Sequence, residues 1–269
     1  MLNNPLMHPW FFLILLAFSS QLFAVELGKW TVSGLNNLLQ SAQTIEDEGS
    51  KIAHISQQFL NTQYKPYTLI GSADKNEQLT VRLDGVDCMT YLESIEAMRR
   101  SHSFADFIKN LKAVRYKNGN VAFQNRNHFF LNWRDNNYPF IEDVTQKIAD
   151  SAGHSVTKQL NEPRQKPLIP GIPVVETLVH YIPGYRINGK ILNRLKNGDY
   201  IGLYTDRAGL DVTHVGIVIK KDKHTFFRHA SAEPFVRKVV DSEFVDYFKH
   251  QRGFVVLRPL ATVLNALMQ

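Results

Sequence analysis

The sequence predicts an α+β protein, because helical patterns fill its first half and strand patterns fill its last third. Residues 30–43, 49–61 and 88–100 carry apolar side chains at helical spacing. From Asp199 onward the apolar residues recur with a period of two. Helices and strands that are segregated along a chain favour an α+β arrangement with an antiparallel sheet over alternating βαβ units.

The first hundred residues predict a cluster of helices. In residues 49–61, Ile52, Ile55 and Phe59 lie along one helical face. A fourth helix is expected to begin after Ser103, whose hydroxyl can cap it and is followed three residues later by Asp106. These helices provide the apolar faces that a sheet can cover.

The middle of the chain is predicted to be a long insertion between these helices and the strands, at about residues 102–190. Asn118-Gly119 indicates a two-residue hairpin between the segments AVRYK and NVAF. Short helices are expected over 127–134 and 140–152. Five prolines between positions 163 and 183 then predict a surface connection over 161–190.

Five short runs after Asp199 predict the strands of the sheet. Each is rich in β-branched or aromatic residues, and turn residues separate most of them. In chain order the runs are YIGLY, HVGIVIK, TFFRHAS, FVRKVV and FVVLRP.

The composition excludes a disordered chain and points to an acidic partner. Of 269 residues, 44% are apolar and 21% are charged, which is an ordinary globular balance. The formal net charge is +6, which suits nucleic acid, an anionic membrane or an acidic cell-envelope polymer. The Lys and Arg residues are scattered and form no recognised nucleic-acid module, so we do not expect nucleic acid.

The N-terminus predicts export. Residues Trp10–Phe18 form an unbroken apolar run of nine, which is shorter than the roughly 20 residues that span a bilayer. This pattern is typical of a signal peptide over residues 1–24, with Ala24 the last residue removed. We expect residues 25–269 to form a single secreted or periplasmic domain with no stable membrane anchor after cleavage. An uncleaved anchor and a buried N-terminal helix remain the alternatives.

The single cysteine, Cys88, is the candidate nucleophile. Gly85 interrupts an extended segment, and Asp87 can then cap the helix that follows, which puts Cys88 in its first turn. A helix N-terminus stabilises a thiolate, so we expect a lowered thiol pKa. The alternative is that Cys88 is an inert core residue.

Two histidines, His214 and His229, are the candidate partners of Cys88, because both lie within strand-like runs. A hairpin turn at Lys221-Asp222 would set them directly opposite one another. One imidazole could then act as a base while the other orients it. The alternative is two half-buried sheet histidines. No HExxH or comparable spacing is present, so no metal is expected.

These segments together resemble the NlpC-type papain-like cysteine hydrolases of the bacterial cell wall. The similarity is greatest to the N-acetylmuramoyl-L-alanine amidase-like branch, formerly a domain of unknown function. It rests on the segment RLDGVDCMT at 82–90, GLDVTHVGIV at 209–218, RHAS at 228–231 and RNHFFLNW at 126–133. The likeness covers roughly residues 40–258 and implies a papain-like fold, with nucleophile-bearing helices packed on an antiparallel sheet or barrel.

The resemblance also implies roles for individual residues. Cys88 would be the nucleophile, His214 the base and His229 the residue that orients it. A tyrosine that helps to form the oxyanion hole would be Tyr64, with Tyr67 as a competing position. Arg126 and His128 would lie on the substrate side, the alternative being that they pack on a connector. Met89 replaces the small residue usual in this family.

The activity implied by the resemblance is cofactor-independent hydrolysis of the N-acetylmuramoyl–L-alanine bond in peptidoglycan muropeptides. A stem-peptide endopeptidase, which cuts between D-glutamate and the diamino acid, is the nearest alternative. A non-catalytic wall-binding protein is the alternative from another class.

Overall fold

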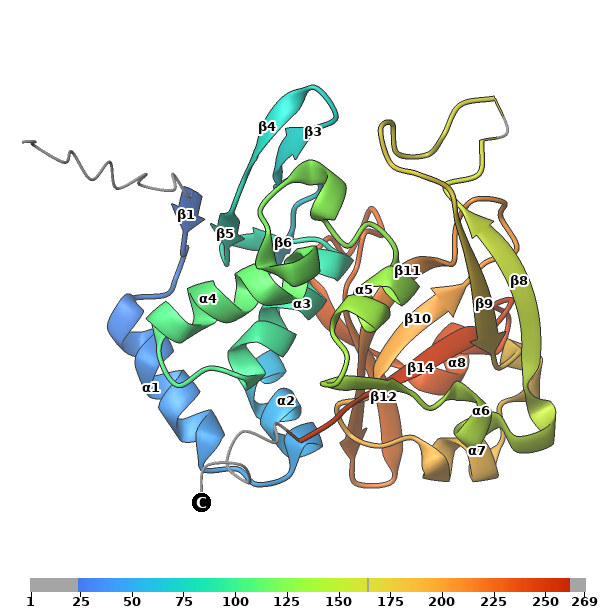
Figure 1. Ribbon diagram of the computed structural model, residues 1–269. Helices are drawn as coiled ribbons and strands as arrows, with labels where there is room; N and C mark the ends of the chain where they lie inside the picture. The colour runs from blue at the N-terminus through green and yellow to red at the C-terminus, as the bar shows by residue number, and fades with distance from the viewer. Residues whose placement is uncertain (1–23, 164, 262–269) are drawn as a thin grey trace, which may run out of the picture.

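The computed structural model describes residues 24–163 and 165–261, and its centre is a six-stranded antiparallel sheet (Figure 1). The strand order is β13-β12-β11-β10-β14-β7. The strands are β7 Ile141–Asp143, β10 Tyr200–Tyr204, β11 Val212–Lys221, β12 His224–Ala230, β13 Val239–Glu243 and β14 Phe254–Pro259. The mixed fold expected from the sequence is therefore confirmed. The predicted signal peptide lies outside the described residues except for Ala24.

Four N-terminal helices cluster beside one face of this sheet. They are α1 Val32–Gln43, α2 Glu48–Gln57, α3 Cys88–Arg99 and α4 Phe104–Arg115. The predicted Ser103 cap is confirmed, since its hydroxyl accepts the Asp106 N–H at 3.1 Å. Helix α3 is central: it packs on β11, the other three helices surround it, and every residue from Thr90 to Arg99 is buried.

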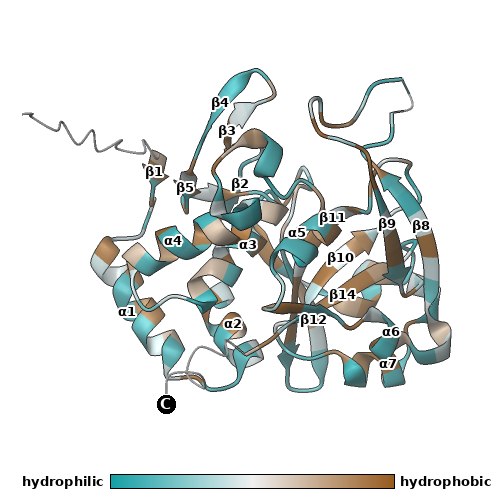
Figure 2. Ribbon diagram, in the orientation of Figure 1, coloured by the Kyte–Doolittle hydropathy of each residue, from teal (hydrophilic) through white to brown (hydrophobic). Residues whose placement is uncertain are grey.

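The sheet has an apolar core on each face because its side chains alternate. Val215, Ile217 and Ile219 of β11 face α3 and the helical cluster. Val218 and Phe227 face the second core, which is covered by α6 Thr145–Ala149, α7 Gly189–Arg194 and α8 Phe244–Phe248. In Figure 2 hydrophobic colour runs through β10 and β14, whereas hydrophilic colour recurs along α1 and α4.

Small two-stranded ladders complete the fold around these layers. Two of them are parallel, β1 Ala24–Glu26 with β5 Thr80–Arg82 and β2 Gln63–Tyr64 with β6 Gly85–Val86. The other two are antiparallel, β3 Ile70–Ser72 with β4 Lys75–Gln78 and β8 His154–Leu160 with β9 Val175–Tyr181. The remaining helix of the α type among the described residues is α5 Phe130–Asn136.

The predicted hairpin at Asn118-Gly119 is wrong, although the turn is real. Both residues have positive φ, 54° and 65°, as a primed turn requires. The preceding segment, however, is the last part of α4 rather than a strand. Its residues continue the apolar helical face with Leu111 and Val114, both buried. Burial of that face outweighs the local hairpin signal.

Two further expectations for the middle of the chain need correction. Residues 140–152 begin with strand β7, which pairs with β14 before the short helix α6 starts. The predicted surface connection over 161–190 contains β9, paired along its whole length with β8. The alternation of apolar and polar residues that would have predicted β9 is weak, because the apolar Leu178 lies on the exposed face of the strand. The predicted fourth strand, FVRKVV, starts only at Val239.

Candidate active site

Cys88 begins α3, as the sequence predicts. The Asp87 carboxylate accepts the Thr90 N–H at 2.8 Å, and the Thr90 hydroxyl accepts the Asp87 N–H at 3.0 Å. This reciprocal capping box fixes the first turn of the helix. The Cys88 residue as a whole is half-buried.

The thiol of Cys88 is protonated at neutral pH, which contradicts the predicted low pKa. Burial raises the pKa of Cys88 to about 12, and the neighbouring Asp87 carboxylate adds to the rise. The backbone N–H groups of Val215, Met89 and Cys88 act in the opposite direction. The helix N-terminus is present, but desolvation and an adjacent negative charge outweigh it. The interaction with the backbone N–H of Val215 also shows that the thiol lies next to β11.

His214 and His229 contact each other directly. Nε2 of His214 and Nδ1 of His229 are hydrogen-bonded at 2.8 Å, with the rings perpendicular. The far nitrogen of His229, Nε2, is hydrogen-bonded to Oγ of Ser242 at 3.1 Å. The three side chains therefore form a chain that crosses β11, β12 and β13.

The turn that was expected to produce this pairing is displaced by one residue, which shifts each cross-strand partner by two residues. Lys221 pairs with His224, so the turn is at Asp222-Lys223 rather than Lys221-Asp222. This register sets Gly216, not His214, across from His229, and the two imidazoles meet diagonally. Gly216 is required there because a Cβ atom would lie 2.5 Å from the Phe227 ring, which stacks on His229.

Both imidazoles are neutral at neutral pH. Burial lowers the pKa of His214 to about 4. Burial and the neighbouring His214 lower the pKa of His229 to about 3. Burial thus favours the neutral forms of the thiol and of both imidazoles over a thiolate–imidazolium pair.

Two residues that the sequence analysis missed complete this cluster. Ser242 ends the hydrogen-bonded chain, and the Tyr247 ring lies 5.0 Å from the His229 ring. Burial raises the pKa of Tyr247 to about 12, and the charge of Cys88 contributes. No local sequence pattern predicts a role for either residue. Ser242 reaches the site because β13 pairs with β12, and Tyr247 reaches it because it lies in α8.

The structure distinguishes the two tyrosine candidates. Tyr64 is paired with Val86 in the β2–β6 ladder, directly before Asp87 and Cys88. Burial raises the pKa of Tyr64, and the charges of Cys88 and Asp87 add to the rise, so its hydroxyl is within electrostatic reach of the thiol. Tyr67 is 96% exposed, which makes it the poorer candidate.

The side chains of Arg126 and His128 are already engaged within the protein. The Arg126 guanidinium donates to both carboxylate oxygens of Glu77, at 2.7 and 2.5 Å. Nε2 of His128 is hydrogen-bonded to the Phe123 carbonyl at 2.8 Å, and burial lowers the pKa of His128. These contacts favour the connector role over the substrate-side role.

No group of three or more His, Cys, Asp or Glu side chains that could hold a metal ion occurs among residues 24–163 and 165–261. In the same ranges, no helix has the length and apolarity needed to cross a bilayer. His224, the third histidine of the strand region, is exposed at the start of β12.

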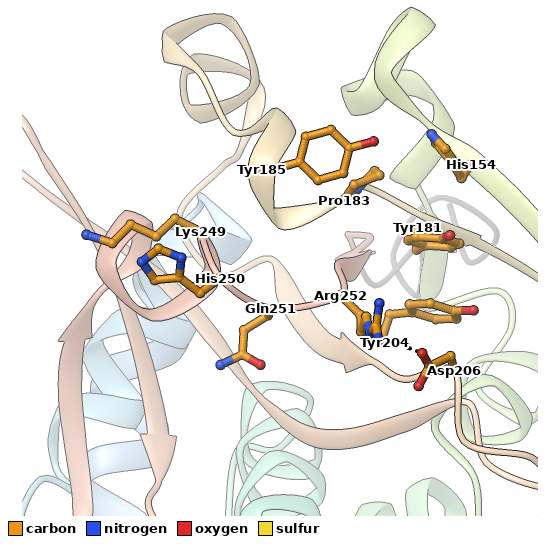
Figure 3. A pocket seen from close by; sticks show the side chains of 10 residues that line it. All are labelled: His154, Tyr181, Pro183, Tyr185, Tyr204, Asp206, Lys249, His250, Gln251 and Arg252. Carbon is orange, nitrogen blue, oxygen red and sulfur yellow. Dashed lines mark ion pairs between the residues drawn. The ribbon is translucent and has the colours of Figure 1, made fainter.

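Two cavities lie on different parts of the surface. One, of about 750 Å³, has Tyr64 in its wall, whereas Cys88 and the two histidines are not among its lining residues. The other, of about 430 Å³, is lined by the stacked rings of Tyr181 and Tyr204, 3.8 Å apart, and by the Arg252–Asp206 ion pair (Figure 3). This second cavity contains none of the predicted site residues.

Comparisons with solved structures agree with this fold. A Legionella pneumophila protein of the DUF1460 family superposes with a TM-score of 0.73 at 23% identity, covering 86% of this chain and 94% of that one. An N-acetylmuramoyl-L-alanine amidase from Bacteroides uniformis gives 0.66 at 26% identity, covering 80% and 99%. A Bacteroides fragilis protein provisionally named a xylanase gives 0.61 at 28%, covering 76% and 98%.

No curated protein matches the chain. A family model described as AmiA-like, N-acetylmuramoyl-L-alanine amidase-like, matches residues 54–254. The match spans Cys88, the paired histidines, Ser242 and the strands that hold them. The chain therefore belongs to the N-acetylmuramoyl-L-alanine amidase-like family.

Proposed function

We propose that this protein is a cysteine amidase of the NlpC-type, papain-like class that hydrolyses the N-acetylmuramoyl–L-alanine bond of peptidoglycan fragments. The observation that carries the proposal is the cluster of Cys88 at the start of α3 and the hydrogen-bonded chain His214–His229–Ser242. Membership of the amidase-like family supports amide hydrolysis as the reaction, and Cys88 with the two histidines could provide the nucleophile and the base.

The hydrogen-bonded chain is compatible with a base at His214. When Nε2 of His214 carries the proton, it donates to Nδ1 of His229, whose own Nε2–H donates to the Ser242 hydroxyl. This tautomer leaves Nδ1 of His214 with a free lone pair. A neutral imidazole with its pKa lowered by burial stays unprotonated, and therefore competent as a base, in weakly acidic solution.

In the proposed reaction, His214 takes the thiol proton as the Cys88 sulfur attacks the carbonyl carbon of the lactyl amide. The tetrahedral oxyanion accepts hydrogen bonds from the Cys88 N–H and the Tyr64 hydroxyl. The C–N bond breaks, His214 protonates the departing L-alanine amine, and a thioester remains. Water then attacks the thioester, releasing the muramoyl carboxylate and regenerating the thiol.

His229 acts as a positioning residue in this scheme. It accepts a hydrogen bond from His214 and shares the positive charge that develops when His214 is protonated. Ser242, the stacked Phe227 ring and the tilted Tyr247 ring hold His229 in place. The same arrangement would serve in a secreted or periplasmic enzyme from which residues 1–24 have been removed.

The test is mass spectrometry of defined muropeptides after incubation with the protein. An amidase releases the complete stem peptide from the sugar. An endopeptidase instead leaves a muramoyl dipeptide, and a wall-binding protein leaves the substrate intact. Cys88→Ser should abolish product formation while the circular dichroism spectrum is unchanged, and full activity in that variant would refute the cysteine mechanism.

A further inference from the structure

The larger cavity, beside Tyr64, is strongly basic. Four cationic side chains line it, from Lys65, Lys75, Arg82 and Arg237, whereas Glu26 is the only carboxylate residue in its lining. Tyr64 forms part of the same wall and is within electrostatic reach of Cys88. Tyr64 thus links the cavity to the surroundings of Cys88, and the excess of positive charge in the cavity attracts anions.

Two of the cations are fixed in position by one carboxylate. Asp84 accepts hydrogen bonds from Arg82 at 3.0 and 2.8 Å and from Lys65 at 2.6 Å. These two cations lower the pKa of Asp84 to about 2, so it stays ionised. The Arg82 side chain remains 32% exposed and can still donate to a ligand. A planar guanidinium already oriented by a carboxylate loses little freedom on binding a second one.

The guanidinium of Arg237 lies over the Tyr64 ring, and the backbone of Arg237 has a conformation that is unusual for arginine. Its φ is 47°, in the left-handed region that favours glycine or asparagine. Its carbonyl accepts the Tyr64 N–H at 2.9 Å, and its guanidinium carbon lies 4.7 Å from the centre of the Tyr64 ring. Among the described residues it has no carboxylate partner. A strained residue with an unpaired charge beside a reacting group suggests a binding role.

The chemistry of the substrate indicates which part would occupy this cavity. On one side of the scissile amide lie N-acetylated sugars, which carry no charge. On the other side is the stem peptide, in which glutamate directly follows L-alanine. One carboxyl group of this glutamate is joined in an amide bond to the diamino acid, and the other is free and ionisable. A carboxylate a few bonds from the leaving amine matches a cationic cavity that begins at Tyr64.

We propose that this cavity is the stem-carboxylate site of the enzyme and that Arg237, with Arg82 behind it, selects muropeptides with an ionised second residue. The inference rests on the proposed amidase function, because it takes the scissile bond to lie at Cys88. It replaces Arg126, whose guanidinium is already paired with Glu77, as the residue that recognises the carboxylate.

The experiment compares four derivatives of N-acetylmuramoyl-L-alanyl-D-glutamate, in which the α-carboxylate, the γ-carboxylate, both or neither are amidated. We expect KM to rise about tenfold when the recognised carboxylate is amidated, the size of one charge-assisted hydrogen bond. Arg237→Gln should raise KM for the diacid by a similar factor and leave the diamide unchanged. Arg237→Lys should recover part of the loss.

Lys223→Gln is the matched control, because it removes one positive charge from the exposed β11–β12 turn, outside the cavity. It should leave the KM of all four derivatives unchanged. Equal KM values for the four derivatives in the unaltered chain would overturn the carboxylate site while leaving the amidase function standing. A fall in kcat alone in Arg237→Gln would mean that Arg237 acts through Tyr64 and would also overturn it.

Failure of the amidase function has a different signature, namely no hydrolysis of any derivative. Calorimetric titration of the Cys88→Ser chain then tests the cavity without turnover. Tighter binding of the diacid than of the diamide, lost in the additional Arg237→Gln variant, supports the carboxylate site. Equal binding of the two overturns it. Because the cations are partly exposed, the diacid should also bind more weakly as salt is added.

Discussion

At the residue scale, the central finding is that neutral groups occupy the candidate active site. Cys88 is at the helix N-terminus that usually favours a thiolate, yet burial and Asp87 raise its pKa. His214 and His229 are buried and hydrogen-bonded, so their pKa values are lowered. In the proposed mechanism, these shifts favour proton transfer from sulfur to His214 during attack rather than before it.

The alkylation rate of Cys88 should report the raised pKa. With iodoacetamide, we expect the rate to climb by about tenfold per pH unit from pH 7 to pH 10 without a plateau, because only the thiolate reacts. Asp87→Asn retains a good helix cap and removes the negative charge, so it should lower the pKa and speed alkylation at pH 8. A plateau at or below pH 8 in the unaltered chain would contradict the neutral thiol.

The two histidines should differ in their importance for turnover. His214→Ala is expected to lower kcat by about a thousandfold or more, since the base is lost. His229→Ala should lower kcat less, because it removes only orientation and charge sharing. Steady-state kinetics on a defined muropeptide measures both. If His229→Ala lowers kcat more than His214→Ala does, the roles of base and positioning residue must be exchanged. Ser242→Ala should lower kcat in the same way as His229→Ala, but by less.

At the scale of elements, buried ion pairs join the helices to the rest of the fold. Arg115 near the end of α4 donates to Glu93 of α3 at 2.6 Å and to the Thr80 carbonyl of β5 at 2.6 Å. Arg115 and Glu93 are both almost fully buried. Helix α3, which carries Cys88, is thereby fixed against α4 and against the ladder that leads to the basic cavity.

Breaking this pair from one side should destabilise the protein strongly. Arg115→Met leaves the Glu93 carboxylate buried without its cation, which costs about 3–5 kcal/mol of unfolding free energy. Adding Glu93→Gln should recover part of that loss, because the uncompensated charge is gone. Urea unfolding followed by circular dichroism gives both values. Strictly additive losses would show that the two side chains are not coupled.

At the scale of the whole molecule, the sheet separates two apolar cores, and the functional groups gather near its strands β11–β13. One core joins the sheet to the helical cluster, and the other lies under the short helices α6, α7 and α8. The histidine pair borders the second core through Phe227 and Tyr247. Protonating these histidines therefore affects the stability of the whole fold.

Global stability should fall in acid because of the buried histidines. Their pKa values in the folded protein are about 4 and 3, below the ordinary value of 6.5. The unfolded chain therefore binds protons first, and the stabilisation present above pH 6.5 is lost as pH falls through 4. The slope is at most about 1.4 kcal/mol per pH unit for each histidine.

Thermal unfolding from pH 7 to pH 4 measures this loss. The double variant His214→Gln/His229→Gln should have a shallower dependence of Tm on pH over the same interval. Equal slopes in the two proteins would show that the histidines titrate normally in the folded state.

Patterns in the sequence were sufficient to predict the segregation of helices and strands, the helix that begins at Cys88 and the strands that carry His214 and His229. These depend on local rules, namely apolar periodicity, capping residues and turn residues, which act within a few positions. Cys88 with Asp87 and Thr90 is such a case, since the whole capping box lies within four residues.

Strand register, pKa shifts and ion pairs depend instead on contacts between distant segments, which local patterns do not specify. The turn of the β11–β12 hairpin is displaced by one residue, which shifts the cross-strand partners by two. The imidazoles still meet, because diagonal neighbours in a sheet are also close. The pKa of Cys88, the pairing of Arg126 with Glu77, and the position of Arg237 over Tyr64 all depend on segments far apart in the chain. Desolvation and ion pairing are set by three-dimensional surroundings, which no local pattern encodes.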